Sequence, residues 1–281
     1  MSAAPAPPGE RGRKAAGQGS TGRVADGALN LVVKEPGRFF ALCLDTFRAM
    51  FKFPFQWREF IQQAWFIVGV TVIPTALVAI PFGAILALQV GGLIRQFGAQ
   101  SFTGAASVVA IVREASPIVT ALLIAGAAGS AICADLGARK IREEIDAMEV
   151  LGINPLHRLV VPRTLACAFV GLFLNGLVSV VGIAGGYIFN VVLQGGTPGA
   201  YLASFSGLAQ LPDLYQAEIK AFVFGITAGL VAAYKGLNAK GGPKGVGDAV
   251  NQTVVITFML LFLENFLLSA LYLQFVPQKG M

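Results

Sequence analysis

The chain has 281 residues, of which 55% are hydrophobic and only 13% are charged. A soluble domain usually carries about 25% charged residues, so this chain has too few to cover a globular surface, and its apolar content excludes disorder over most of its length. The net charge of +6 comes from basic residues that stand beside apolar runs, which indicates membrane topology and not nucleic-acid binding. These values predict an all-α polytopic membrane protein.

The first 62 residues divide into two segments of different composition. Residues 1–30 are rich in alanine, proline, glycine, serine and charge, which predicts a disordered cytoplasmic tail. Residues 37–62 predict an interfacial helix, because between 37 and 52 one face is apolar and the opposite face is mostly cationic. The apolar face consists of Phe40, Leu44, Phe47 and Phe51.

Five later segments are apolar and long enough to cross a bilayer, which takes about 20 residues. They cover about 65–90, 105–134, 164–193, 219–234 and 250–273. If the N-terminus is inside, 17 Lys and Arg residues lie in inner segments and 3 in outer ones, namely Arg95, Lys220 and Lys279. The excess of inner positive charge predicts a cytoplasmic N-terminus and an outer C-terminus.

Small residues recur at a spacing of four in the second, third and fourth predicted spans. Such stripes let helix backbones approach closely in lipid, either within one chain or between two chains. Both alternatives stay open from the sequence. The stripes consist of Gly126, Ser130 and Ala134, of Gly182 and Gly186, and of Gly225 and Gly229.

A short charged segment follows the second span. Residues 138–152 predict a cytoplasmic helix on which Ile141, Ile145 and Met148 share one face, and the helix is closed by Gly152. Its acidic surface and thin apolar ridge are typical either of a solvated helix or of a helix that docks in a groove of a partner. The residues assigned to docking are Arg142, Glu143, Glu144, Asp146, Met148 and Glu149.

Charged and polar residues also occur inside the predicted spans. Arg113 and Glu114 interrupt the second span, and Glu264 and Asn265 lie in the fifth. Ionisable residues at membrane depth are costly and are functional candidates by default. Arg113 and Glu114 form either a structural ion pair or part of a transport path. Glu264 or Asn265 in the fifth span could face Glu114 across a cavity.

The motifs of common enzymes do not occur in the sequence. The glycine-rich stretch Lys240–Asp248 lacks the P-loop pattern, so ATP hydrolysis by the usual phosphate cradle is excluded. The three cysteines are widely spaced and indicate neither a disulfide framework nor a metal site. Three hypotheses remain: a permease driven by a separate ATPase, an ion-coupled secondary transporter that uses Glu114 and Glu264, and, least favoured, a membrane enzyme that acts on lipid.

Several motifs in the same order resemble the MlaE/YrbE permease family, over about residues 36–275. They are Arg113–Pro117, Gly129–Ala131, Ala134–Gly137, Glu144–Pro155, Val161–Arg163, Ala239–Asp248 and Phe266–Leu271. The chain is most similar to a YrbE subunit of an actinobacterial Mce system. In relatives an aspartate commonly precedes the phenylalanine of the last span, whereas this chain has Asn265 there, with Glu264 before it.

The resemblance implies a permease subunit of an ABC transporter that moves lipid, with import of a fatty acid, mycolic-type lipid or sterol. It implies an interfacial helix, five spans, and a coupling helix at 138–152 seated in a cytoplasmic ATPase dimer, which binds the ATP and magnesium, so this chain needs no cofactor. It further implies a second, unlike YrbE permease, MCE-domain proteins on the outer side, a plasma-membrane location and no nucleic-acid partner. The lipid pocket between the two permeases would include Gln89, Leu93, Arg113 and Glu114.

Overall fold

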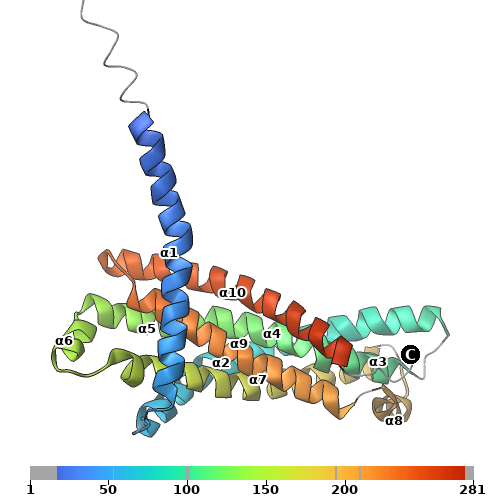
Figure 1. Cartoon of the computed structure of the whole chain (residues 1–281). Helices are drawn as coiled ribbons and strands as arrows, with labels where there is room; N and C mark the ends of the chain where they lie inside the picture. The colour runs from blue at the N-terminus through green and yellow to red at the C-terminus, as the bar shows by residue number, and fades with distance from the viewer. Residues whose placement is uncertain (1–17, 53, 99–101, 194, 209, 276–281) are drawn as a thin grey trace, which may run out of the picture. The chain divides into compact units, whose positions relative to one another are not determined.

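The structure, a computed structural model, describes residues 18–52, 54–98, 102–193, 195–208 and 210–275. Within these ranges every regular element is a helix (Figure 1), so the all-α prediction is confirmed. The chain divides into two units, Met1–Asp45 and Thr46–Met281, and each is described by itself.

The first unit contains most of one long helix. Helix α1 covers Gln18–Met50 and has Pro36 in its interior. It therefore includes residues 18–30, for which the composition predicts disorder, while residues 1–17 lie outside the described ranges. The interfacial helix predicted over 37–62 is two elements, since α1 ends at Met50 and α2 begins at Trp57. Pro54 lies in the break, where its missing N–H and fixed φ disfavour a continuous helix.

The second unit holds five helical segments that are long and apolar enough to cross a membrane, as the sequence predicts. The first is α2 (Trp57–Gln96), the fourth α9 (Leu211–Leu237) and the fifth α10 (Gly242–Phe275). The second joins α3 (Thr103–Val109), η2 (Ala110–Ala115), α4 (Ser116–Leu123), η3 (Ile124–Gly129) and α5 (Ser130–Ile141). The third joins η4 (Leu156–Val160), α7 (Val161–Ile188) and η5 (Phe189–Leu193).

Two short helices lie between these spans. Helix α6 (Glu144–Val150) follows the second span, and α8 (Pro198–Leu208) follows the third. They lie at opposite ends of the bundle (Figure 1). The sequence analysis did not predict α8, whereas α6 forms part of the segment that it assigned to docking.

Glycines at the crossing points allow the helices of the bundle to pack closely. Helix α2 packs along α7, α7 along α9, and α9 along α10 and α5. A Cβ on Gly225 would lie 2.6 Å from the carbonyl oxygen of Cys167, and one on Gly229 would lie 2.8 Å from Cα of Thr164. The glycines of the fourth span therefore serve packing within the chain, while a Cβ on Gly126 would meet nothing within 4 Å.

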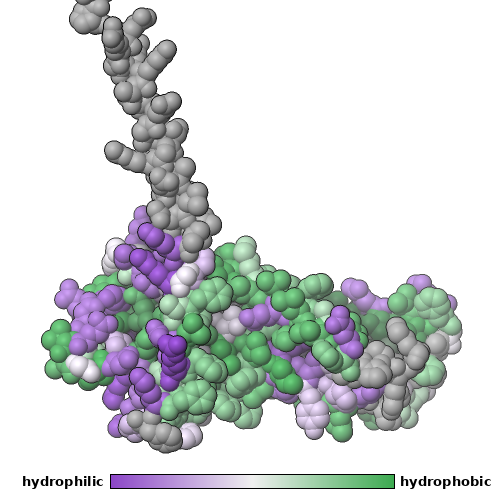
Figure 2. All heavy atoms as spheres, in the orientation of Figure 1, coloured by the Kyte–Doolittle hydropathy of each residue, from purple (hydrophilic) through white to green (hydrophobic). Residues whose placement is uncertain are grey.

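The first and fifth spans are the least buried of the five. Apolar side chains cover most of the visible face of the spans, whereas polar side chains gather at the end that carries α6 (Figure 2). On α10 the exposed apolar side chains include Val255, Met259, Phe262 and Phe266. Such faces suit contact with lipid chains or with another membrane subunit.

Candidate functional site

Two charged side chains lie where the second span changes its helix geometry. Arg113 and Glu114 belong to η2, a π-helical turn. Turns of this kind are frequent at functional sites. Pro117 follows four residues after Arg113 and has no N–H, so the Arg113 carbonyl cannot receive the usual α-helical hydrogen bond from that position. The ammonium of Lys220 lies 3.4 Å from this carbonyl and donates to it instead.

Lys220 is fully buried among polar partners from two other elements. Its Nζ donates to Oγ of Ser269 on α10 at 2.8 Å and lies 3.7 Å from a carboxylate oxygen of Glu114. An ammonium can remain charged at such a depth only when anions and acceptors replace its water shell. The buried position therefore depends on these contacts.

The structure corrects the expected position of Lys220, which the sequence analysis placed in an outer segment at the limit of a span 219–234. Helix α9 begins at Leu211, so Lys220 lies within the fourth span. Gln210 and Asp213 form a capping box, and Pro212 stands in the first turn of the helix. Proline followed by an acidic residue is a helix-start signal, and it would have located this end.

A second set of contacts joins Arg113 to α9 and α10. Nη1 of Arg113 lies 4.0 Å from Oδ1 of Asp213, and the guanidinium stands 5.0 Å above the ring of Tyr272. The Tyr272 hydroxyl donates to the same oxygen of Asp213 at 2.8 Å. Arg113 is also 3.6 Å from a carboxylate oxygen of Glu114. The three helical elements are thus connected by one polar cluster, here called the η2 cluster.

The η2 cluster comprises Arg113, Glu114, Asp213, Lys220, Ser269 and Tyr272. Its two cations and two carboxylates balance in formal charge. The charged side chains differ in solvent exposure: Lys220 is 0% exposed and Asp213 is 9% exposed, whereas Glu114 is 45% exposed. Glu114 is therefore the carboxylate of the cluster that a polar group outside the chain can reach.

The other predicted pocket residues lie apart from this cluster. Glu264 accepts a hydrogen bond from the Thr227 hydroxyl at 2.7 Å, so the structure does not pair it with Glu114. Its other carboxylate oxygen and Oδ1 of Asn265 are buried without a partner among the described residues. Gln89 and Leu93 lie on the exposed side of α2 and take part in none of these contacts.

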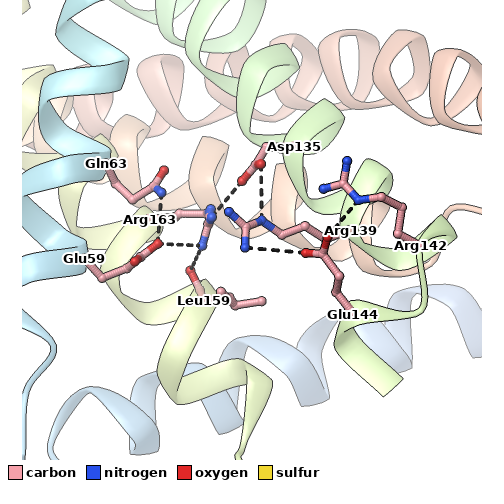
Figure 3. A network of polar contacts seen from close by, with 8 residues as sticks. All are labelled: Glu59, Gln63, Asp135, Arg139, Arg142, Glu144, Leu159 and Arg163. Atoms are coloured by element: carbon pink, nitrogen blue, oxygen red, sulfur yellow. Dashed lines mark hydrogen bonds and ion pairs between the residues drawn. The ribbon is translucent and has the colours of Figure 1, made fainter. Parts of the chain in front are cut away.

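A second polar network lies at the end of the bundle that carries α6. Figure 3 shows the buried guanidinium of Arg163 between Glu59 of α2 and Asp135 of α5. Arg163 donates to Asp135 at 2.7 Å and to the carbonyl of Leu159 at 3.0 Å, and it lies 3.5 Å from Glu59. Sequence reasoning did not find this network, because its members come from three spans that are far apart in the chain.

Ion pairs continue from this network to α6. Arg139 lies 3.3 Å from Asp135 and 3.8 Å from Glu144, and Arg142 donates to Glu144 at 2.7 Å (Figure 3). Two of the carboxylates assigned to docking are thus already paired within the chain, Glu144 with these arginines and Asp146 with Lys140. A chain of charges therefore runs from the start of α6 to the first span.

The predicted docking helix at 138–152 is divided by a turn. Helix α5 ends at Ile141 and α6 begins at Glu144, while Glu143 between them has a left-handed backbone with φ 60°. A residue in this conformation ends a right-handed α-helix, because its dihedral angles turn the backbone away from the helix axis, and for a residue with a Cβ the conformation also costs energy. The turn lets α6 change direction relative to the second span.

The apolar residues of α6 divide between an inner and an outer side. Ile145 is buried and Met148 packs against the core, so these two residues of the predicted ridge face the bundle, whereas Ile141 is 37% exposed. Val150 and Leu151 at the end of α6 are 88% and 75% exposed. Glu149 is exposed and lines a hollow of about 480 Å³ beside α6. The outward surface of α6 is therefore an apolar tip beside a carboxylate.

Comparison with known proteins identifies the chain's relatives. A family model described as "Permease MlaE" matches residues 60–271. A probable ABC transporter permease protein of Synechocystis is 35% identical over 208 residues, which are 74% of this chain and 79% of that protein. One of Rickettsia bellii is 28% identical over 84% of this chain and 91% of its own length. The chloroplastic protein trigalactosyldiacylglycerol 1 of Arabidopsis thaliana is 30% identical over 64% of this chain and 53% of its own.

The residues matched by the family model include α6 and most of the five spans. Five apolar helices and this ancestry agree with a multi-pass membrane protein. The chain belongs to the MlaE permease family.

Proposed function

We propose that this chain is the membrane subunit of an ABC transporter that moves lipids and is driven by a separate cytoplasmic ATPase. The observation that carries the proposal is the apolar tip of α6, where Val150 and Leu151 are exposed at the polar end of the bundle. Exposed apolar side chains beside an acidic residue suit a groove on a soluble partner. The ion pairs behind the tip would connect this partner to three spans.

The finer identity of the transporter is part of the same proposal. Resemblance to actinobacterial Mce systems favours a YrbE subunit that pairs with an unlike YrbE permease, contacts MCE-domain proteins outside and imports lipid at the plasma membrane. The apolar faces of α2 and α10 offer area for a second permease. One relative is named after a galactolipid, trigalactosyldiacylglycerol, which supports a lipid as cargo.

Within this transporter, we assign the polar part of the lipid to the η2 cluster. Glu114 is accessible, while Arg113 and Lys220 supply positive charge beside it. Polar groups that fix orientation within a mainly apolar pocket are typical of small-molecule sites. Glu264 and Asn265 lie apart from the cluster and their partnerless oxygens are buried, so their part in the transport path stays a separate prediction.

The docking assignment is tested by placing a charge at the tip of α6. In the full transporter, Val150→Asp and Leu151→Asp should each reduce copurification of the ATPase about tenfold, since a carboxylate would have to be buried in the contact. Leu211→Asp is the matched control, because Leu211 is 69% exposed at the other end of the bundle. An undiminished yield of ATPase with both tip variants would contradict the docking surface.

The source of energy is tested with the purified complex in liposomes. Lipid movement should require ATP and the ATPase subunit, and it should continue when the proton gradient is dissipated. Movement that needs no nucleotide but stops with the proton gradient would instead indicate a secondary transporter that uses the intramembrane carboxylates.

A further inference from the structure

An apolar groove lies between the beginnings of α2 and α7. It has a volume of about 660 Å³ and an entirely apolar lining. Phe60, Ala64 and Val68 contribute to it from α2 and are partly buried against the core, while Trp57 and Phe173 on its margin are 66% and 76% exposed. The base of the groove is therefore formed by residues packed on the core, and aromatic side chains at its margin are open to the surroundings.

Contacts between aromatic rings hold the walls in place. The rings of Phe55 and Trp57 are 4.8 Å apart, and those of Phe60 and Phe169 are 5.8 Å apart, both with edge-to-face geometry. This arrangement is favourable for aromatic pairs and restricts rotation of the rings. The slot is thus formed by the chain itself, before any occupant enters it.

Two exposed arginines adjoin the aromatic residues at the start of the groove, Arg58 in the sequence and Arg158 through a contact with Gln56. Arg58 follows Trp57 in the sequence and is exposed. Arg158 is also exposed, and its guanidinium lies 3.4 Å from the side-chain oxygen of Gln56, the residue between Phe55 and Trp57. The acid nearest in sequence, Glu59, is turned inward to Arg163 and does not neutralise them.

We propose that this groove binds an anionic glycerophospholipid, with one acyl chain along the aromatic walls and the phosphate at Arg58 and Arg158. Arginine suits this position because its planar fork matches phosphate oxygens, and basic residues beside a membrane surface favour anionic lipids. An apolar groove with exposed arginines beside Phe55 and Trp57 offers separate places for the acyl chain and for the phosphate of one lipid. A protein helix would leave the arginines without anions unless it supplied acidic residues.

The groove is separate from the η2 cluster. The cluster uses the start of α9 and the end of α10, which lie at the end of the bundle opposite α6 (Figure 1). The groove lies near Glu59 and Arg163, which belong to the network that reaches α6. The bound lipid would therefore occupy a site distinct from that of the cargo.

Native mass spectrometry of the full-length chain tests the proposal, with phosphatidylglycerol and phosphatidylcholine of identical acyl chains as probes. We expect phosphatidylglycerol to bind more tightly, and Arg58→Gln and Arg158→Gln each to weaken it about fivefold. Arg158→Lys should retain part of the affinity. Lys235→Gln is the matched control, because Lys235 contacts Gln252 between α9 and α10.

Two further variants test the acyl part of the site. Ala64→Trp should fill the groove and Phe173→Ala should shorten its wall, and both should weaken phosphatidylglycerol binding. Because Phe173 is exposed, its variant keeps the test valid if Ala64→Trp does not fold. Equal affinity for the two lipids, or unchanged phosphatidylglycerol binding in both groove variants, would overturn the proposal. Loss of a second copy of the chain from the spectrum of Ala64→Trp, with lipid binding unchanged, would also overturn it.

Discussion

Glu114 and Lys220 are partners with unequal access to water. Lys220 is fully buried, whereas the Glu114 side chain is 45% exposed and also lies near Arg113. Removal of one member of a buried ion pair is costly when it leaves the other charge without compensation. The charge of Lys220 is therefore compensated mainly by Glu114, whereas the charge of Glu114 is also stabilised by water and by Arg113.

This difference predicts unequal effects of two isosteric or near-isosteric changes. Glu114→Gln should destabilise the protein by about 2 kcal/mol, less than the loss of a fully buried anion would cost, because the carboxylate that the ammonium loses is 45% exposed and partly screened by solvent. Lys220→Met should cost less, and the double variant should recover part of the loss. Thermal unfolding of the purified variants measures the effect, and equal losses in both single variants would contradict the assignment.

Glu143 permits a second prediction at the scale of one residue. Its left-handed backbone, with φ 60°, costs roughly 1 kcal/mol for a residue that carries a Cβ. Glu143→Gly should therefore be neutral or raise the melting temperature, whereas Glu143→Val should lower it, because β-branched residues avoid this conformation. A lower melting temperature for the glycine variant would show that the Glu143 side chain stabilises the turn.

At the scale of elements, backbone contact between α7 and α9 determines how the third and fourth spans pack. Gly225 faces the backbone of Cys167 and Ala168, where no Cβ fits without a shift of one helix. In lipid, this close approach supplies dispersion contacts that replace the hydrophobic effect as the force between helices. The glycine pattern thus stabilises a particular pair of spans.

Gly225→Leu should therefore separate α7 from α9 and reduce the yield of folded protein several-fold. Gly69→Leu on α2 is the matched control, because a Cβ there would meet nothing within 4 Å. Size-exclusion chromatography in detergent gives the yield of monodisperse protein. A normal yield of Gly225→Leu would contradict the observed packing.

At the scale of the whole molecule, the positions of basic residues predict the orientation in the membrane. Lys220 lies within a span, so only Arg95 and Lys279 remain of the three residues assigned to the outer side. The same bounds place seven residues of the inner set within spans, namely Arg58, Arg139, Lys140, Arg158, Arg163, Lys235 and Lys244, so 10 inner residues remain against 2 outer ones. The excess of inner positive charge is kept, and it still predicts the N-terminus in the cytoplasm and the C-terminus outside.

Labelling of single introduced cysteines in intact cells tests this orientation. Phe275→Cys at the end of α10 should react with a membrane-impermeant maleimide, whereas Ala147→Cys in α6 should react only after the cells are permeabilised. The unmodified chain, with Cys43, Cys133 and Cys167, gives the background. The reverse pattern would place α6 outside and remove the basis for its contact with a cytoplasmic ATPase.

The sequence by itself determined the helical class and the five spans, and it singled out Arg113, Glu114 and the segment that contains α6 as candidates for function. These features depend on local composition and periodicity, which do not require knowledge of distant contacts. The sequence did not determine the depth of Lys220, because a lysine near an apolar run resembles the end of a span.

Only the tertiary structure decided which polar residues meet. Arg163, Asp135 and Glu59 come from different spans, and Lys220 reaches both Ser269 and the carbonyl of Arg113. It also decided that Ile145 faces the bundle while Val150 and Leu151 face outward. The physical reason is that a buried charge must find anions or acceptors wherever the packed helices bring them, and the order of residues along the chain does not record those distances.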